Sequence, residues 1–122
     1  MKTLLRVMAL LEAGAGIALL IAPSITIAIL LGASSDDALV FIVARIAGIA
    51  LLTLALACWL SRNSNGASGM MKAMFIYNIA VAGLLAKTGL TSEFSSVGLW
   101  AVVFLHAVVA IWCAMELRKP SN

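Results

Sequence analysis

The chain has 122 residues, of which 64% are hydrophobic and 11% are charged. Soluble domains carry roughly 25% charged residues, so this composition excludes an ordinary soluble protein and indicates an integral membrane protein. A helix of about 20 apolar residues crosses the ~30 Å hydrocarbon core of a bilayer, so the length allows about four spans in a single domain over 1–122. The net charge is +3, but the basic residues are scattered at helix ends, which argues against nucleic acid as a partner.

The first segment begins with Lys2 and Arg6 and continues as an apolar run. A signal peptide begins in the same way, but Glu12 interrupts the apolar run. The small residues at 32–34, which could form a cleavage site, also lie too far along the chain for a signal peptide. We therefore expect a retained first helix over about 3–22, which Pro23 ends or kinks. The apolar segment at 25–31 is too short to span a membrane, and is either a kinked continuation or an interfacial segment.

Three longer segments complete the predicted fold. Residues 38–60 predict the second helix, and Asp37 is a suitable N-cap in front of it. A polar, glycine-rich turn follows at 61–69, then a third helix over about 70–86, a loop at 87–96 and a fourth helix over about 97–117. The predicted fold class is all-α, a four-helix transmembrane bundle in contact with the lipid bilayer.

The distribution of basic residues predicts the orientation of the bundle. With four spans, both termini and the turn between the second and third helices lie on one side of the membrane. That side carries six basic residues: Lys2, Arg6, Arg62, Lys72, Arg118 and Lys119. The other side carries Lys87 together with Asp36, Asp37 and Glu93. The positive-inside rule therefore predicts that both termini are cytoplasmic.

Arg45 is the residue of 38–60 that does not belong in lipid. It lies about 10 Å below one membrane edge, a depth from which snorkelling does not easily bring the whole guanidinium group to water. Its charge is permanent, so we expect it to face a neighbouring helix, a water-filled cavity or a carboxylate. Each of the other three helices contributes a polar residue to the same middle layer, about 10–19 Å from the cytoplasmic edge. These residues are Glu12, Asn78 (beside Tyr77) and His106.

Three interpretations of this polar set remain open. In the first, Glu12 and Arg45 form a buried structural ion pair, and Tyr77, Asn78 and His106 complete its hydrogen bonds. In the second, the set is a proton or ion relay or a polar substrate site, with Glu12 or His106 titrating. In the third, Glu12 or Arg45 contacts a partner protein or a lipid headgroup.

Several other chemistries lack a signal in the sequence. A single histidine excludes a bis-histidine haem within one chain, and no nucleotide-binding or catalytic motif is visible. Cys58 and Cys113 lie in apolar segments without a metal-type spacing, so we predict buried, inert thiols, no metal site and no catalytic residue. The hexapeptide AGIALL occurs twice, at 15–20 and at 47–52. This match either arises by chance or reflects an internal repeat of the kind found in transporters.

The residues Arg6, Leu11-Glu12-Ala13-Gly14, Pro23, Arg45-Ile46-Ala47-Gly48 and Ala57-Cys58-Trp59-Leu60 resemble small four-helix bacterial membrane proteins of the DoxX type. The resemblance runs over most of the chain. It implies a bacterial inner (cytoplasmic) membrane protein, and it suggests a quinone-associated redox subunit, because that group includes subunits of quinone-linked oxidoreductases. It carries over no catalytic residue. Small multidrug exporters also have a glutamate in their first helix, but Glu12 is followed here by Ala-Gly-Ala-Gly rather than by the Val-x-Gly-Thr type of continuation.

The leading functional hypothesis is an accessory or interaction subunit without chemistry of its own, with a membrane-protein partner or a second copy of the chain. The alternative is a small proton-linked transporter that uses Glu12, Arg45 and His106. The quinone-associated subunit is a third hypothesis and rests on the resemblance alone.

Overall fold

The computed structural model describes residues 1–119, and its regular structure is entirely helical. The five helices are α1 (Lys2–Ile21), α2 (Pro23–Leu31), α3 (Ala38–Ser61), α4 (Ala67–Thr91) and α5 (Val97–Leu117). All except the short α2 are long and apolar enough to cross a membrane. The expected all-α bundle of four transmembrane helices is confirmed, and the protein is a multi-pass membrane protein.

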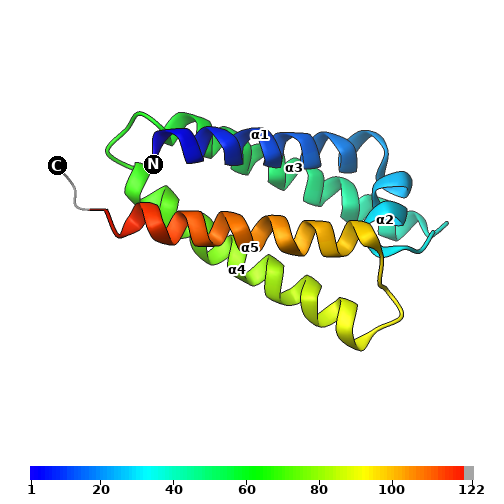
Figure 1. The fold of residues 1–122 in the computed structure, drawn as a ribbon. Coiled ribbons are helices and arrows are strands. Elements are labelled where there is room, and N and C mark those ends of the chain that lie inside the picture. The colour runs from blue at the N-terminus through cyan, green and yellow to red at the C-terminus, as the bar shows by residue number, and fades with distance from the viewer. Residues whose placement is uncertain (120–122) are drawn as a thin grey trace.

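The long helices form two antiparallel pairs. α1 packs along α3 and α4 packs along α5, whereas contacts between the two pairs are much sparser (Figure 1). We call the end of the bundle that holds Met1 and the end of α5 the terminal end. The short helix α2 lies at the opposite end, between the α1–α3 pair and α5, and we call this the α2 end (Figure 1).

Two glycines allow α1 and α3 to approach closely. A Cβ atom built on Gly16 would lie 2.8 Å from the carbonyl oxygen of Gly48, and one built on Gly48 would lie 2.8 Å from the carbonyl oxygen of Gly16. Because helices in lipid associate through close packing, this backbone contact is where the first pair is tightest. The two AGIALL segments therefore face each other across the crossing, in equivalent positions of two antiparallel helices.

The hydrophobic core lies at the terminal end, where all four long helices contribute. Its buried members are Leu4, Leu5, Met8, Ala9, Cys58, Met71, Met74, Val109 and Cys113. At the same end Glu116 pairs with both the Met1 amino group and the Lys119 ammonium group. The terminal end is thus the densely packed part of the bundle.

The helix α2 begins and ends at backbone positions that the sequence specifies. Ala22 interrupts the helical conformation with φ −131°, and Pro23 restarts it at the first position, where a missing N–H costs nothing. Gly32 ends α2 in the left-handed region with φ 70°, which a residue without a Cβ adopts freely.

Ser96 fastens α2 to the start of α5. Its hydroxyl oxygen accepts a hydrogen bond from the Leu99 N–H at 3.0 Å as the N-cap of α5. The same hydroxyl lies 3.0 Å from the carbonyl oxygen of Ile29 and 2.7 Å from that of Leu30, and donates to this pair. Any Cβ at Gly98 would collide with the Ile29 carbonyl, so α2 and α5 meet backbone to backbone.

Both ends of α4 differ from the sequence-based prediction by several residues. α4 runs over Ala67–Thr91 rather than 70–86, because the polar residues after Ala86 continue the helix. The hydroxyls of Thr88 and Thr91 donate to the carbonyl oxygens of Leu84 and Lys87, four residues earlier, at 3.0 and 2.8 Å. The expected N-cap of α3 is confirmed: the Asp37 carboxylate accepts a hydrogen bond from the Leu39 N–H at 2.8 Å.

Candidate functional site

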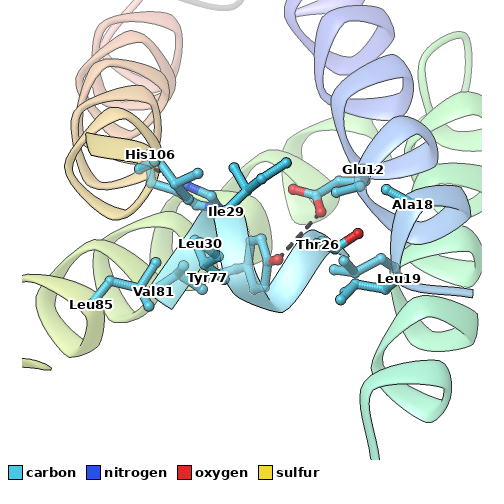
Figure 2. A pocket seen from close by; sticks show the side chains of 14 residues that line it. Glu12, Ala18, Leu19, Thr26, Ile29, Leu30, Tyr77, Val81, Leu85 and His106 are labelled. Atoms are coloured by element: carbon cyan, nitrogen blue, oxygen red, sulfur yellow. Dashed lines mark hydrogen bonds between the residues drawn. The ribbon is translucent and has the colours of Figure 1, made fainter. Parts of the chain in front are cut away.

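A cavity of about 420 Å³ lies between the two helix pairs, with α2 on one of its sides (Figure 2). All five helices contribute to its wall, which is mostly apolar. Its lining residues are Glu12, Ala15, Ala18, Leu19, Thr26, Ile29, Leu30, Leu51, Tyr77, Val81, Leu85, Gly98, Val102 and His106. A cavity of this size is within the range of small-molecule sites, which are typically apolar with a few placed polar groups.

Glu12 is the charged residue among those that line the cavity. Its side chain is 7% exposed, and its Oε2 atom accepts a hydrogen bond from the Tyr77 hydroxyl at 3.3 Å (Figure 2). The ion pairs found within residues 1–119 are the two formed by Glu116, so none joins Glu12 to a basic side chain. A carboxyl group at membrane depth is expensive unless it is protonated or paired.

Tyr77 and His106 stand on neighbouring helices, α4 and α5. Their ring centroids are 6.0 Å apart with an interplanar angle of 58°, within the usual range for tilted aromatic pairs. The His106 Nδ1 atom lies 2.9 Å from the carbonyl oxygen of Val102. Because a carbonyl only accepts, Nδ1 carries a proton in this contact, and Nε2 of a neutral ring is then an acceptor.

Asn78 belongs to the same layer but to a different space. It is 3% exposed, and its side-chain nitrogen donates to the carbonyl oxygen of Met74 in its own helix at 2.7 Å. It lines a smaller cavity of about 110 Å³ together with Glu12 and His106. The structure thus places Glu12 and His106 at both cavities, Tyr77 at the larger one and Asn78 at the smaller one.

Arg45 is placed differently, and the expected ion pair with Glu12 is wrong. Arg45 is exposed, on the side of α3 that also exposes Ile42 and Ile49, and it pairs with no carboxylate within residues 1–119. The physical reason is the close contact at Gly48, which sets the rotation of α3 about its axis and turns Arg45 away from α1. Its side chain starts about 10 Å from the beginning of α3 and is tilted towards that end of the helix.

The helix α2 also belongs to the site, although its sequence carries no polar residue of the predicted set. Thr26, Ile29 and Leu30 of α2 line the cavity, and the Thr26 hydroxyl donates to the Ala22 carbonyl oxygen at 2.8 Å. Pro23 was the available signal, because proline at a first helical position indicates a new helix as well as a break.

Within residues 1–119 no three or more His, Cys, Asp or Glu side chains are grouped so that they could hold a metal ion. Cys58 and Cys113 are buried free thiols. The polar side chains in the wall of the larger cavity are the carboxyl group of Glu12, the phenol of Tyr77, the imidazole of His106 and the hydroxyl group of Thr26.

The fold and the cavity together define a class: a small helical membrane protein with a mostly apolar cavity between its two helix pairs. Comparison with protein-family models, with curated protein sequences and with solved structures found no match.

Proposed function

We propose that this protein binds an apolar molecule with a basic group in the cavity between its helix pairs, and exchanges it for a proton at Glu12. Its activity would then be that of a small proton-linked carrier. The observation that carries the proposal is the Glu12 carboxyl, which lies at the wall of a cavity of about 420 Å³ without a cationic side chain to pair with among the described residues.

The chemistry of the wall indicates the chemistry of the ligand. Apolar side chains from five helices suit a hydrophobic body, whereas Glu12 suits a cation and Tyr77 holds the carboxylate in place through its hydroxyl. A proton and an organic cation compete for the same carboxylate, because the desolvated charge needs one partner at a time. This competition is the coupling that a proton-linked carrier requires.

A quinone, suggested by the DoxX resemblance, fits the wall less well. Quinone carbonyls need hydrogen-bond donors, but the Tyr77 hydroxyl already donates to Glu12 and the Nδ1 atom of His106 contacts Val102. Because these two donors already have acceptors, the cavity offers a carboxylate to a cation but no free hydrogen-bond donor of Tyr77 or His106 Nδ1 to a carbonyl. We therefore retain the quinone as a ligand to be tested rather than as the proposed one.

The membrane and the orientation form part of the proposal. Six basic residues belong to the terminal end by sequence, and Met1 and the end of α5 lie there (Figure 1). By the positive-inside rule we propose that this end is cytoplasmic, in the inner membrane of a bacterium.

A second candidate function, the accessory subunit, is supported by Arg45. This arginine is exposed on a side of α3 that is otherwise apolar. A partner helix with a carboxylate at the same depth would pair with it. Co-purification of a stoichiometric partner that is lost on Arg45→Leu would support this function.

The carrier proposal is tested with tetraphenylphosphonium, a permanent lipophilic cation, and the purified protein in detergent. We expect saturable binding that weakens at least tenfold in Glu12→Gln and weakens as the pH falls, because protons then occupy the carboxyl. Glu93→Gln is the matched control, since Glu93 is exposed in a loop and does not line the cavity. Equal binding by Glu12→Gln and the native protein would overturn the proposal, and ubiquinone binding that survives Glu12→Gln would favour the quinone.

A further inference from the structure

The terminal end of the bundle contains an unusual concentration of sulfur. Within residues 1–119, eight large side chains are fully buried, and five of these eight contain sulfur. These five are Met8, Cys58, Met71, Met74 and Cys113, each 0–1% exposed. A membrane bundle can fill its interior with Leu, Ile, Val and Ala, so packing alone does not require thiols and thioethers here.

The five sulfur-containing side chains come from every long helix and belong to one buried cluster. Met8 lies on α1, Cys58 on α3, Met71 and Met74 on α4, and Cys113 on α5. The Cys113 Sγ atom lies 3.9 Å from the Met8 Sδ atom. Two sulfur ligands at ~2.3 Å from a metal in a trigonal arrangement are themselves about 4 Å apart, so this pair already has the separation of two ligands of one ion.

We propose that this sulfur cluster binds a soft monovalent metal ion, Cu(I), with Cys113 and Met8 as ligands and either Met71 or Met74 as the third. Thiolate and thioether ligands select Cu(I) over harder ions. One thiolate neutralises one Cu(I), so a site of one cysteinate and two neutral sulfurs carries no net charge and suits an apolar interior. A thiol that binds the ion releases its proton to the solvent.

The site is distinct from the cavity of the carrier proposal. Met8 precedes Glu12 by four residues, about 6 Å along α1 towards the terminal end. None of the five sulfur-containing side chains lines the larger cavity, and Met8 lines the smaller one together with Glu12 and His106. Three of the five sulfur atoms in the cluster are methionine thioethers and two are cysteine thiols.

The first experiment measures Cu(I) retention. The purified full-length protein, kept reduced under argon, is titrated with Cu(I) against the chelator bicinchoninate, and X-ray absorption identifies the ligand atoms. We expect one Cu(I) per chain with a sulfur-only shell at ~2.3 Å, and much weaker retention of Zn(II). No retention in competition with the chelator, or a shell containing nitrogen or oxygen, would overturn the proposal.

The second experiment compares variants. Met8→Leu removes the thioether at nearly constant volume, a substitution that buried sites tolerate well, and we expect it to weaken Cu(I) binding at least tenfold. Met115→Leu is the matched control, because Met115 is 60% exposed on α5, two residues from Cys113, and its binding should equal that of the native protein. Cys113→Ser should abolish retention. If that variant does not fold, Met8→Leu decides, and native-like binding by Met8→Leu would refute Met8 as a ligand.

Discussion

The contact between Gly16 and Gly48 gives the sharpest quantitative prediction. In Gly16→Ala the new methyl group would lie 2.8 Å from the Gly48 carbonyl oxygen and 3.1 Å from the backbone nitrogen of Leu52. Both neighbours are backbone atoms, so α1 and α3 must move apart, and overpacking of this kind costs about 1–3 kcal/mol. Alanine also favours the helical state by up to ~1 kcal/mol relative to glycine, which partly offsets the cost.

Gly14→Ala isolates the steric cost. Gly14 lies in the same helix, and a Cβ built there meets no atom within 4 Å. The gain in helix propensity is common to both variants and cancels, so Gly16→Ala should be less stable than Gly14→Ala by about 1–3 kcal/mol. The assay is reversible unfolding in mixed micelles of dodecyl maltoside and SDS, followed by tryptophan fluorescence.

The reciprocal geometry extends the same prediction. Gly48→Ala should lose as much stability as Gly16→Ala, and the double variant should lose less than the sum, because one separation of the helices relieves both contacts. If Gly16→Ala is as stable as Gly14→Ala, the close approach of α1 and α3 does not exist and the reasoning fails.

Three further variants test the placement of single side chains. Ser96→Ala removes the hydrogen bonds that join α2 to α5 and should cost about 1–2 kcal/mol, with faster hydrogen exchange in α2; unchanged exchange would contradict this role. Arg45→Leu should change the unfolding free energy by less than about 0.5 kcal/mol and show no coupling to Glu12→Gln, whereas breaking a buried ion pair would cost about 3–5 kcal/mol. Tyr77→Phe should cost about 1 kcal/mol through the lost hydrogen bond to Glu12 and should weaken cation binding, a result that native-like affinity would rule out.

The parts of this structure that sequence predicts well are those that depend on position along a helix axis. Apolar runs of about 20 residues set the four spans, and a rise of 1.5 Å per residue sets the depth of each polar side chain. Depth alone placed Glu12, Arg45, Asn78 and His106 in one layer, and the structure places all of these except Arg45 around adjoining cavities.

Rotation about the helix axis is harder to predict, and this explains the error at Arg45. Arg45 and Gly48 are three residues apart, so they point in directions about 60° apart around α3. When α1 approaches the backbone at Gly48 the interface becomes narrow, and 60° is enough to leave Arg45 outside it. The chain is so rich in small residues that its sequence did not show which residue packs against Gly48. That residue is Gly16, which occupies the same position in the first AGIALL segment.

The uneven packing of the bundle links its stability to its ligand. The terminal end and the Gly16–Gly48 contact hold the helices together, whereas the walls of the larger cavity lack partner atoms on one side and forfeit their dispersion contacts. A molecule that fills the cavity restores those contacts and binds only the folded state. It should therefore raise the unfolding free energy by about 2.7 kcal/mol at a concentration of 100 times its Kd. Since the proposed cation is held by Glu12, tetraphenylphosphonium at that concentration should stabilise Glu12→Gln, which binds at least tenfold more weakly, by no more than about 1.4 kcal/mol, whereas equal stabilisation of both proteins would show that the cavity selects its ligand by shape alone.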